Sequence, residues 1–323
     1  LNGSMVWDYN NVGMQNGSGF FNDYSTTQGA LILPFHDDSL KYYLFYFDPF
    51  PPDYGFYFSV VDLNLNYGFG SIISGLKNIK LLNFFLSEKL TAVKHGNGRD
   101  RWVLVHGMDN NTFYKFIVTN GGIGLHDTQN IGSFHFIIPP SGLAGGIQGE
   151  MEFSQDGTKL GVVNVTGIID IFDFDRCTGQ LSNWLELGDD SSLVNLNYYG
   201  CSFSPNGKIL YISSGYPDNE IIQFDLNNDI IDSIILSKQI IWQATTQKFL
   251  GQLQLAPDNK IYLASGDANE IWPPTGVTSF YNQYLSVINN PDTVGFGCNL
   301  SSHSFYLGGN NCMLGLPNHP NYT

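Results

Sequence analysis

Side chains capable of acid–base chemistry or hydrogen bonding stand just ahead of segments that recur along the chain, where they would gather around one opening of the fold. These positions are Gln28, Glu88, Lys89, Glu150, Glu152, Tyr198, Tyr199, Gln252, Gln254 and His303. Carboxylates beside tyrosines and amides on a concave surface could bind a sugar, and two of the carboxylates could act as acid and base on a glycosidic bond. The plainer interpretation is favoured: these side chains hydrogen-bond strand ends and channel water.

Motifs of the common catalytic classes do not occur in the sequence. It contains no Gly-Lys-Ser/Thr phosphate loop, no H-E-x-x-H and no G-x-S-x-G. Aspartates that could hold calcium stand close together at Asp37-Asp38, Asp189-Asp190, and Asp173 with Asp175. None has the spacing of a calcium-binding loop with a distal glutamate. We therefore expect no catalytic residue, metal or cofactor, with calcium as the alternative.

The elements that would position the polar set are β-hairpins. The phrase FSQDGTKLGVVN at Phe153–Asn164 returns as FSPNGKILYISS at Phe203–Ser214 and as LAPDNKIYLASG at Leu255–Gly266, with Asn259 in place of the turn glycine. In each copy an apolar run meets Asp-Gly, Asn-Gly or Asp-Asn, which tolerate the positive φ of a tight turn. The copies begin 50 and 52 residues apart, a period expected for the blades of a β-propeller.

A second phrase follows each hairpin and predicts the third strand of each unit. It is a short strand that ends in Asp or Asn, with one degenerate copy, and it occurs at Val6-Trp7-Asp8, Val60-Val61-Asp62, Phe116-Ile117-Val118, Phe172–Asp175, Gln223–Asp225 and Val287–Asn289. The stretch from Ser301 to Pro317 predicts part of another blade. The sequence therefore predicts an all-β fold, a single β-propeller domain over residues 1–323 with six or seven four-stranded blades.

Composition excludes some functions and favours an extracellular β-rich domain. Aromatic residues make up 15% of the 323 residues and charged residues only 13%. The net charge of −15, with 14 Lys and Arg, disfavours nucleic acid as a partner. No apolar run reaches the roughly 20 residues that a membrane helix needs, so we expect no direct membrane insertion. The chain begins at Leu1, which we interpret as the start of a fragment of a longer exported protein.

An ordered series of segments carries a family resemblance. The segments are Glu88–His95 with Asn97–Asp100, Phe172–Gly179, Gly200–Pro205, Leu253–Asp258, Val287–Pro291, Leu316–Asn318 and Pro320–Tyr322. Together the series resembles the propeller of large cell-surface and secreted Bacteroidetes proteins that are exported by the type IX system, often with a sorting or gliding-motility domain. The resemblance implies export and a surface location but no common activity. The upstream blade and the sorting domain usual in that family do not appear in this sequence.

Four cysteines fit an exported chain. Their even number favours disulfides, and the natural pairs are Cys177 with Cys201 and Cys298 with Cys312. Four cysteines allow three connectivities, and the alternative is four buried thiols.

Three short segments resemble the Asp-Ser/Thr-aliphatic acceptor pattern of Bacteroidetes O-glycosylation. They are Asp38-Ser39-Leu40, Asp232-Ser233-Ile234 and Asp292-Thr293-Val294, with Ser39, Ser233 and Thr293 as the acceptors. We predict sugar adducts on at least one of these side chains.

The functional prediction is a non-catalytic surface or adhesion module that binds a glycan or an extracellular protein. One alternative is a secreted polysaccharide hydrolase or lyase that uses carboxylates such as Glu150 and Glu152. Another is a structural subunit or spacer of an extracellular filament, which would associate with copies of itself. The aromatic run from Tyr42 to Phe47 could stack against sugars, although use in the core is favoured.

Overall fold

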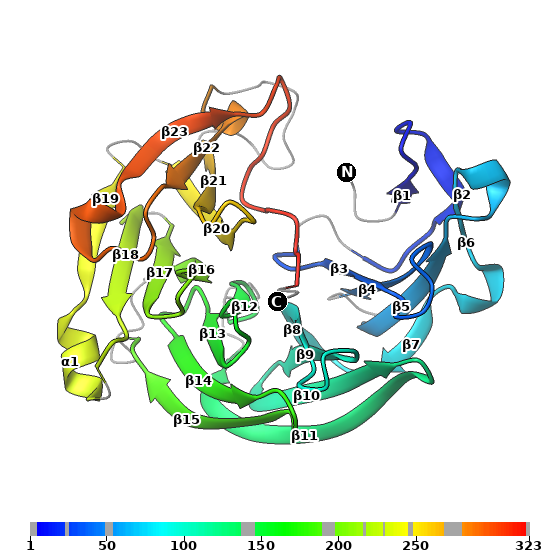
Figure 1. Ribbon diagram of the computed structural model, residues 1–323, viewed down its shortest axis with the longest axis horizontal. Helices are drawn as coiled ribbons and strands as arrows, with labels where there is room; N and C mark the ends of the chain where they lie inside the picture. Colours follow the sequence, from blue (N-terminus) through cyan, green and yellow to red (C-terminus); the bar gives the residue numbers. More distant parts are fainter. Residues whose placement is uncertain are drawn as a thin grey trace. The chain divides into compact units, whose positions relative to one another are not determined.

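The computed structural model describes residues 5–22, 26–48, 54–136, 146–188, 198–215, 218–228, 230–244, 248–267 and 280–320 (Figure 1). The chain divides into two units. Unit 1 comprises residues 1–147, 175–180 and 318–322, and unit 2 comprises residues 148–174, 181–317 and 323. Each unit is described by itself. The described part of both units is built almost entirely of β-strands, which confirms the all-β prediction.

Unit 1 begins with a seven-stranded sheet. Its strands are β1 (Met5–Trp7), β2 (Gly13–Ser18), β3 (Ala30–Pro34), β4 (Lys41–Asp48), β5 (Gly55–Asp62), β6 (Ser71–Ile72) and β7 (Ile79–Leu82). They are ordered β1-β2-β6-β5-β4-β3, and β7 pairs with β5. Short 3-10 helices, η1 (Asn66–Gly68) and η2 (Ser74–Leu76), flank β6. The hairpin β1–β2 joins this sheet through one parallel pair, Gln15 opposite Ser71.

The second sheet of unit 1 is a four-stranded antiparallel meander. It contains β8 (Leu86–Lys94), β9 (Arg101–Gly107), β10 (Asn110–Thr119) and β11 (Gly122–His135), in chain order. Aromatic side chains of the two sheets share one core, in which the rings of Phe56 and Phe116 are 5.3 Å apart. Most of the run from Tyr42 to Phe47 is buried, so its main use is in the core, as favoured from the sequence.

Apart from Asp175 and Gln180, which belong to unit 1, unit 2 contains three further meanders of four strands. The first is β12 (Met151–Phe153), β13 (Lys159–Val163), β14 (Ile169–Asp175) and β15 (Gln180–Glu186). The second is β16 (Tyr198–Phe203), β17 (Ile209–Ser214), β18 (Glu220–Asp225) and β19 (Gln239–Gln243), with α1 (Ile231–Leu236) before β19. The third is β20 (Lys248–Leu255), β21 (Ile261–Asp267), β22 (Tyr284–Ile288) and β23 (Leu300–Tyr306), with 3-10 helices η3 (Phe280–Gln283) and η4 (Gly295–Cys298).

The three repeated phrases form the predicted hairpins. They correspond to β12–β13, β16–β17 and β20–β21. The turn residues Gly157, Gly207 and Asn259 have φ angles of 72°, 69° and 62°. This left-handed conformation is the one that glycine and asparagine adopt most readily. The predicted third strands lie in β14, β18 and β22, in sheets with the antiparallel meander of propeller blades.

The predicted number of six or seven blades is wrong for the described residues, which form four four-stranded sheets and one seven-stranded sheet. The sequence predicts separate blades for Val6-Trp7-Asp8 and Val60-Val61-Asp62, but β1 and β5 belong to one sheet because β2 pairs with β6. The C-terminal stretch also differs from the prediction. Its strand β23 is the fourth strand of the sheet that begins with β20.

The disulfide prediction is wrong, since none of the four cysteines is disulfide-bonded. Cys201 is buried in β16 and Cys298 is buried beside Tyr211. Cys312 Sγ lies 2.9 Å from the carbonyl oxygen of Gly315. Cys177 is exposed in a turn, where its backbone N–H donates to Asp175. Each cysteine therefore has its own local environment, which spacing in the sequence did not reveal.

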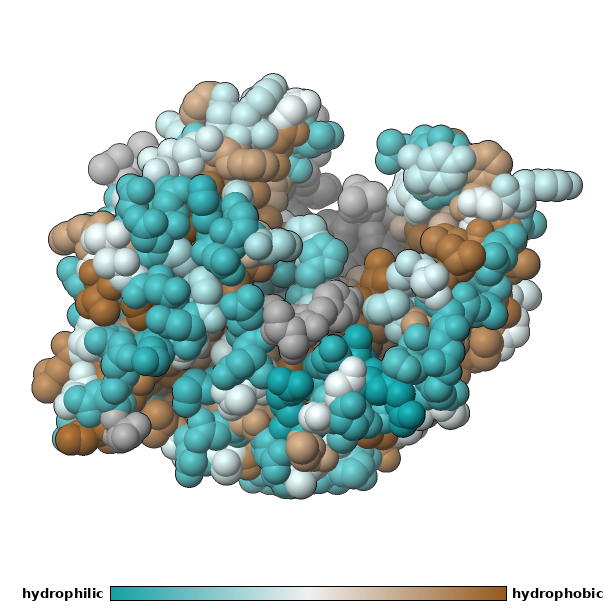
Figure 2. All heavy atoms as spheres, in the orientation of Figure 1, coloured by the Kyte–Doolittle hydropathy of each residue, from teal (hydrophilic) through white to brown (hydrophobic). Residues whose placement is uncertain are grey.

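The surface is mainly polar in the view of Figure 2, where hydrophobic residues form small scattered groups among hydrophilic ones. Scattered apolar side chains of this kind are normal on a folded domain. No helix among the described residues is long and apolar enough to cross a membrane.

Candidate functional site

The residues singled out from the sequence divide between the two units. Unit 1 holds Gln28, Glu88 and Lys89, and unit 2 holds Glu150, Glu152, Tyr198, Tyr199, Gln252, Gln254 and His303. Tyr199, Gln254 and His303 are partly exposed, while the other seven are buried. Buried polar side chains need hydrogen-bond partners, and the partners of these residues indicate the role of most of them.

In unit 1, the predicted residues connect strand ends. The Glu88 carboxylate accepts hydrogen bonds from the backbone N–H and the hydroxyl of Thr27, at 2.8 and 2.7 Å. Gln28 Oε1 accepts from the N–H of Leu90, and Lys89 Nζ donates to the carbonyl of Ile147. Strand β8 carries a bulge between Leu86 and Leu90. A bulge breaks the alternation of the two faces, so consecutive polar residues such as Glu88 and Lys89 can both be buried.

Two buried histidines lie close to Lys89. The rings of His106 and His135 stack with their centroids 3.9 Å apart. Burial, and then the charge of Lys89, lowers the pKa of His106 to about 3. The pKa of His135 is also well below the usual value, because of burial and the charges of His106 and Lys89. Both imidazoles are therefore neutral at neutral pH. His106 Nδ1 lies 2.7 Å from the carbonyl of Gly107.

In unit 2, Glu150 connects the first strands of three sheets. It precedes β12, and its Oε2 accepts hydrogen bonds from the N–H of Cys201 in β16, at 3.0 Å, and of Leu253 in β20, at 3.3 Å. Its backbone carbonyl accepts from the N–H of Val163 in β13. Burial raises the pKa of Glu150 to about 8, although the two N–H groups act in the opposite direction.

Glu152 is the less satisfied member of this carboxyl pair. It is 7% exposed, and among the described residues no hydrogen-bond donor or cation contacts its carboxyl group. Burial, and then the charge of Glu150, raises the pKa of Glu152 well above the usual glutamate value. Two buried carboxyl groups whose charges repel each other do not both ionise at neutral pH. The Glu152 carboxyl group can therefore carry a proton, while the Glu150 carboxyl group is held in place by two backbone N–H donors.

Among the other predicted residues of unit 2, Tyr198, Gln252 and His303 make contacts that connect neighbouring segments. The hydroxyl of Tyr198 lies 3.4 Å from Lys238 Nζ. Gln252 Oε1 accepts a 2.6 Å hydrogen bond from the N–H of Leu316. The backbone N–H of His303 donates to Ser286 Oγ. Gln254 and Tyr262 are opposite each other in the β20–β21 ladder.

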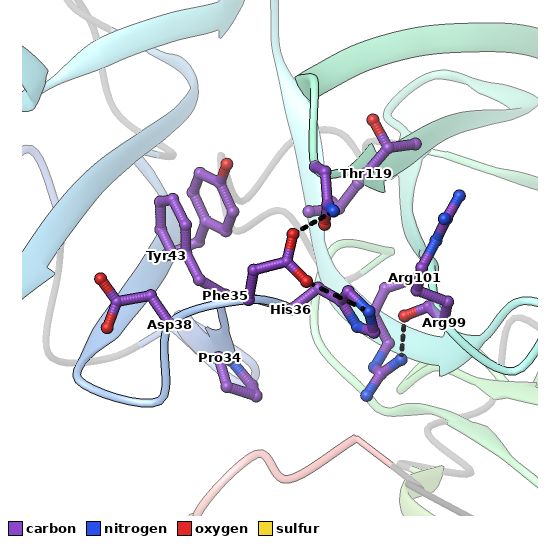
Figure 3. A pocket seen from close by; sticks show the side chains of 11 residues that line it. Pro34, Phe35, His36, Asp38, Tyr43, Arg99, Arg101 and Thr119 are labelled. Atoms are coloured by element: carbon purple, nitrogen blue, oxygen red, sulfur yellow. Dashed lines mark hydrogen bonds and ion pairs between the residues drawn. The ribbon is translucent and has the colours of Figure 1, made fainter.

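A pocket of about 290 Å³ in unit 1 lies outside the predicted set (Figure 3). It is formed by the turns β3–β4, β8–β9 and β10–β11 and their neighbouring strand ends. Its lining is Pro34, Phe35, His36, Asp37, Asp38, Tyr43, Arg99, Arg101, Val118, Thr119 and Asn120. We call it the arginine pocket. Figure 3 shows Phe35 and Tyr43 on one side of it and Arg99 and Arg101 on the other.

The arginine pocket combines an aromatic wall with charged and polar side chains. The rings of Phe35 and Tyr43 stack at 4.1 Å, inclined by 13°. Arg99 and Arg101 are two of only three arginines in the chain. Arg99 uses Nε to pair with Asp100 at 3.0 Å, and this hydrogen bond lowers the pKa of the Asp100 carboxyl. Arg101 Nη1 donates to the carbonyl of Arg99 at 2.7 Å.

The acidic side chains of the arginine pocket are also engaged. Asp38 pairs with Lys41 at 3.1 Å, and Asp37 pairs with His36 at 3.4 Å. Asn120 donates a hydrogen bond to Asp37, which links the β3–β4 turn to the β10–β11 turn. The sequence did contain a signal for this site: Arg99-Asp100-Arg101 follows a Gly-Asn-Gly turn in a chain almost without arginine. The sequence does not predict that the β3–β4 and β10–β11 turns lie beside these arginines.

Of the candidate calcium residues, Asp37 and Asp38 line the arginine pocket, whereas the candidate glycosylation residues do not belong to its lining. Ser39 and Thr293 are exposed, whereas Ser233 in α1 is partly buried. No group of three or more His, Cys, Asp or Glu side chains converges to hold a metal within the part of the chain that the structure describes. The pair Asp189-Asp190 lies outside that part.

Comparison with known proteins gives only distant similarity. No family model and no curated protein matches the chain. A structure of a putative 6-phosphogluconolactonase from Bacteroides uniformis is 13% identical over 86% of this chain and 82% of that chain, with a TM-score of 0.49. The periplasmic gluconolactonase of Pseudomonas aeruginosa is 13% identical over 89% of this chain and 86% of its own, with a TM-score of 0.48. The Cps50 (Swd1) β-propeller domain of Myceliophteria thermophila is 12% identical over 72% and 65% of the two chains, with a TM-score of 0.41. Similarity this low assigns no activity.

Proposed function

We propose that the chain is a non-catalytic saccharide-binding module and that the arginine pocket binds a sugar carrying a carboxylate. The observation that carries this proposal is the placement of Arg99 and Arg101 opposite the stacked rings of Phe35 and Tyr43. A location on the cell surface belongs to the same proposal and is supported by the resemblance to exported Bacteroidetes propellers.

The chemistry of an acidic sugar matches the two sides of this pocket. The apolar face of a pyranose ring packs against aromatic rings such as Phe35, while its hydroxyls hydrogen-bond side chains such as Thr119 and Asn120. The guanidinium group presents its N–H groups in a fork that matches a carboxylate. Because Arg99 pairs with Asp100 through Nε, its terminal nitrogens can engage a ligand carboxylate. The Arg99 side chain is 52% exposed, so a ligand can reach it.

The test uses oligogalacturonates and oligoalginates, with neutral oligosaccharides of the same length as the comparison, titrated calorimetrically into the intact chain. We expect Arg99→Gln to weaken binding of the uronates about tenfold, the cost of losing one charge-assisted hydrogen bond. The matched control is Lys208→Gln, which removes one positive charge from an exposed turn of unit 2 and should leave binding unchanged. Absence of uronate binding, or binding that Arg99→Gln does not weaken, would contradict the proposal.

A second candidate function is acid–base hydrolysis at the Glu150–Glu152 pair. The observation that favours it is the unequal environment of the two carboxyls, since Glu150 is held by two N–H groups and Glu152 is not. Unequal carboxyl pairs are how acid and base roles are separated in hydrolases. Its test is mass spectrometry of polysaccharides incubated with the protein: shortened products that Glu152→Gln abolishes would support it, and intact polysaccharides would exclude it for the substrates used.

A further inference from the structure

We propose a second ligand site in unit 2, a pocket beside Trp184 that binds one ring of a neutral saccharide. The pocket has a volume of about 450 Å³, within the range of roughly 300–1,000 Å³ in which small-molecule sites fall. It lies between β14 and β15 of one sheet and the segment from β18 to α1 of the next. We call it the Trp184 pocket. This inference does not depend on the arginine pocket, because all of its lining residues belong to unit 2.

Trp184 offers an exposed flat apolar surface at the edge of a sheet. It lies in β15, the outermost strand of the β12–β15 sheet, and its side chain is 41% exposed. The apolar wall continues through Ile171 and Ile234, which are buried, and Leu226, which is partly buried. An indole face beside aliphatic side chains suits the C–H face of a pyranose ring, because both surfaces are poorly hydrated and flat.

Polar groups stand beside the indole in a fixed arrangement. Lys159 Nζ contacts Asp173 Oδ1 at 2.9 Å, and Asn183 Nδ2 donates to Asp173 Oδ2 at 2.8 Å. Partial burial alone would raise the pKa of Asp173, but the contacts from Asn183 and Lys159 outweigh it and lower that pKa. The Asp173 carboxylate is therefore ionised, its orientation is fixed by Asn183, and its charge is balanced by Lys159. Its remaining lone pairs can accept hydrogen bonds from sugar hydroxyls.

The backbone of β15 is distorted where it meets this pocket. Asn183 has a φ of +50° inside the strand, a left-handed conformation that is uncommon outside glycine and tolerated best by Asn and Asp. The Asn183 side chain donates a hydrogen bond to Asp173, and Trp184 is the next residue in the strand. A strained conformation of this kind often persists at a ligand site, because it aims side chains that a regular strand would direct elsewhere.

Charge distinguishes the Trp184 pocket from the arginine pocket. The acidic and the basic side chain in its lining, Asp173 and Lys159, pair with each other, so the pocket offers no unbalanced charge to an acidic or a basic ligand. Asn228 adds an amide to the same lining. A neutral sugar ring can hydrogen-bond the amides of Asn183 and Asn228 through its hydroxyls and pack its apolar face against the indole of Trp184. The geometry thus favours a neutral sugar over a uronate.

The test titrates cellohexaose, maltohexaose, mannohexaose and xylohexaose into the intact chain and follows tryptophan fluorescence and heat. We expect at least one of them to bind, and Trp184→Ala to weaken that binding about tenfold or more, as removal of an aromatic anchor does. The matched control is Trp7→Ala, which removes another exposed tryptophan, 45% exposed on the edge strand β1, and should leave binding unchanged. Asp173→Asn, a nearly isosteric change, should weaken binding of the same sugar in a protein that still unfolds cooperatively, although loss of the ion pair with Lys159 lowers its unfolding temperature.

The outcomes separate the two sites. Neutral-sugar binding that survives Arg99→Gln but not Trp184→Ala supports the Trp184 pocket, whatever the uronates do. Absence of binding for all four neutral probes, or binding unaffected by Trp184→Ala, would overturn it. Self-association that Trp184→Ala abolishes would also overturn it, because a second copy of the chain would then be the occupant.

Discussion

Glu152 is the residue whose chemistry departs furthest from an ordinary surface glutamate. Its pKa in the folded protein is raised well above the unfolded value of 4.5. Such a group stabilises the fold fully below pH 4.5 and loses that contribution as the pH rises toward the raised value. We therefore predict that Glu152→Gln increases the free energy of unfolding by about 1–3 kcal/mol at pH 8 and changes it little at pH 4.5. Chemical denaturation at both pH values measures the difference.

The control for this prediction is Glu186→Gln, which alters a partly exposed glutamate at the end of β15 and should leave the pH dependence as in the wild type. A Glu152→Gln protein that is less stable than the wild type at pH 8 would mean that the Glu152 carboxylate is satisfied by contacts other than those described. The raised pKa would then have no structural basis.

The sequence identified the buried carboxyls but neither pocket. Glu150 and Glu152 could be found because they stand directly before a local hairpin phrase. Arg99 faces Phe35 across the arginine pocket, but 63 intervening residues separate them in the sequence, and only the pairing of turns from two sheets brings them together. Trp184 was missed for the same reason, since its pocket depends on α1 from the next sheet.

At the scale of single elements, the repeated hairpins allow a direct test of turn chemistry. One of the three repeats has Asn259 at the turn position that Gly157 and Gly207 occupy in the other two. All three residues have φ angles of 62–72°. We predict that Gly207→Asn lowers the free energy of unfolding by less than about 1 kcal/mol, because asparagine tolerates the left-handed region. Gly207→Val should cost about 1–3 kcal/mol, because a β-branched residue does not tolerate it.

Crowding does not confound this comparison. Among the described residues, a Cβ atom added at Gly207 would have no neighbour closer than 3.8 Å outside the two adjacent residues, so the difference between the two variants reports mainly the backbone conformation. Thermal or chemical unfolding of the pair provides the measurement. Equal destabilisation by Asn and Val would show that the turn relaxes away from its left-handed φ, and that the recurring Gly and Asn are not required by it.

Hairpins could be predicted because their determinants are local: a turn residue and the two apolar runs beside it. The cysteines show the opposite case. The sequence predicts a pair of Cys177 and Cys201 because the first follows the third strand of one unit and the second begins the first strand of the next, yet Cys201 is buried in β16 and Cys177 is exposed in a turn. A disulfide requires a specific distance and direction between two side chains, and neither can be derived from the order of strands.

For the molecule as a whole, the sequence predicted the class of sheet better than the number of sheets. Four meanders with the predicted strand order are present in the described residues. The count failed at β1 and β2, which join the ladder of β3–β7 through the single residue pair of Gln15 with Ser71. No periodic phrase marks that contact, so the hairpin was counted as a separate blade.

The two units should respond to pH in opposite directions. In unit 1, burial holds the pKa of His106 near 3, below its usual 6.5, so its contribution to stability is present above pH 6.5 and lost as the pH falls toward 3. In unit 2, the raised pKa of Glu150, about 8, gives a contribution that is present below pH 4.5 and lost as the pH rises toward 8. Acid should therefore loosen unit 1, and mild alkali should loosen unit 2.

Hydrogen exchange at pH 5 and pH 8, corrected for the intrinsic exchange rates, tests this directly. We predict that peptides from β8–β11 lose protection at pH 5 relative to pH 8 and that peptides from β12–β16 lose it at pH 8 relative to pH 5. Glu152→Gln should reduce the change in unit 2 alone, because it removes one of the two carboxyl groups with a raised pKa. His135→Gln should reduce the change in unit 1 alone, because it removes one of the two histidines with a lowered pKa. If protection changes in the same direction in both units between pH 5 and pH 8, the prediction is wrong. A single cause would then act on the whole chain, instead of two buried pairs that respond to pH in opposite directions.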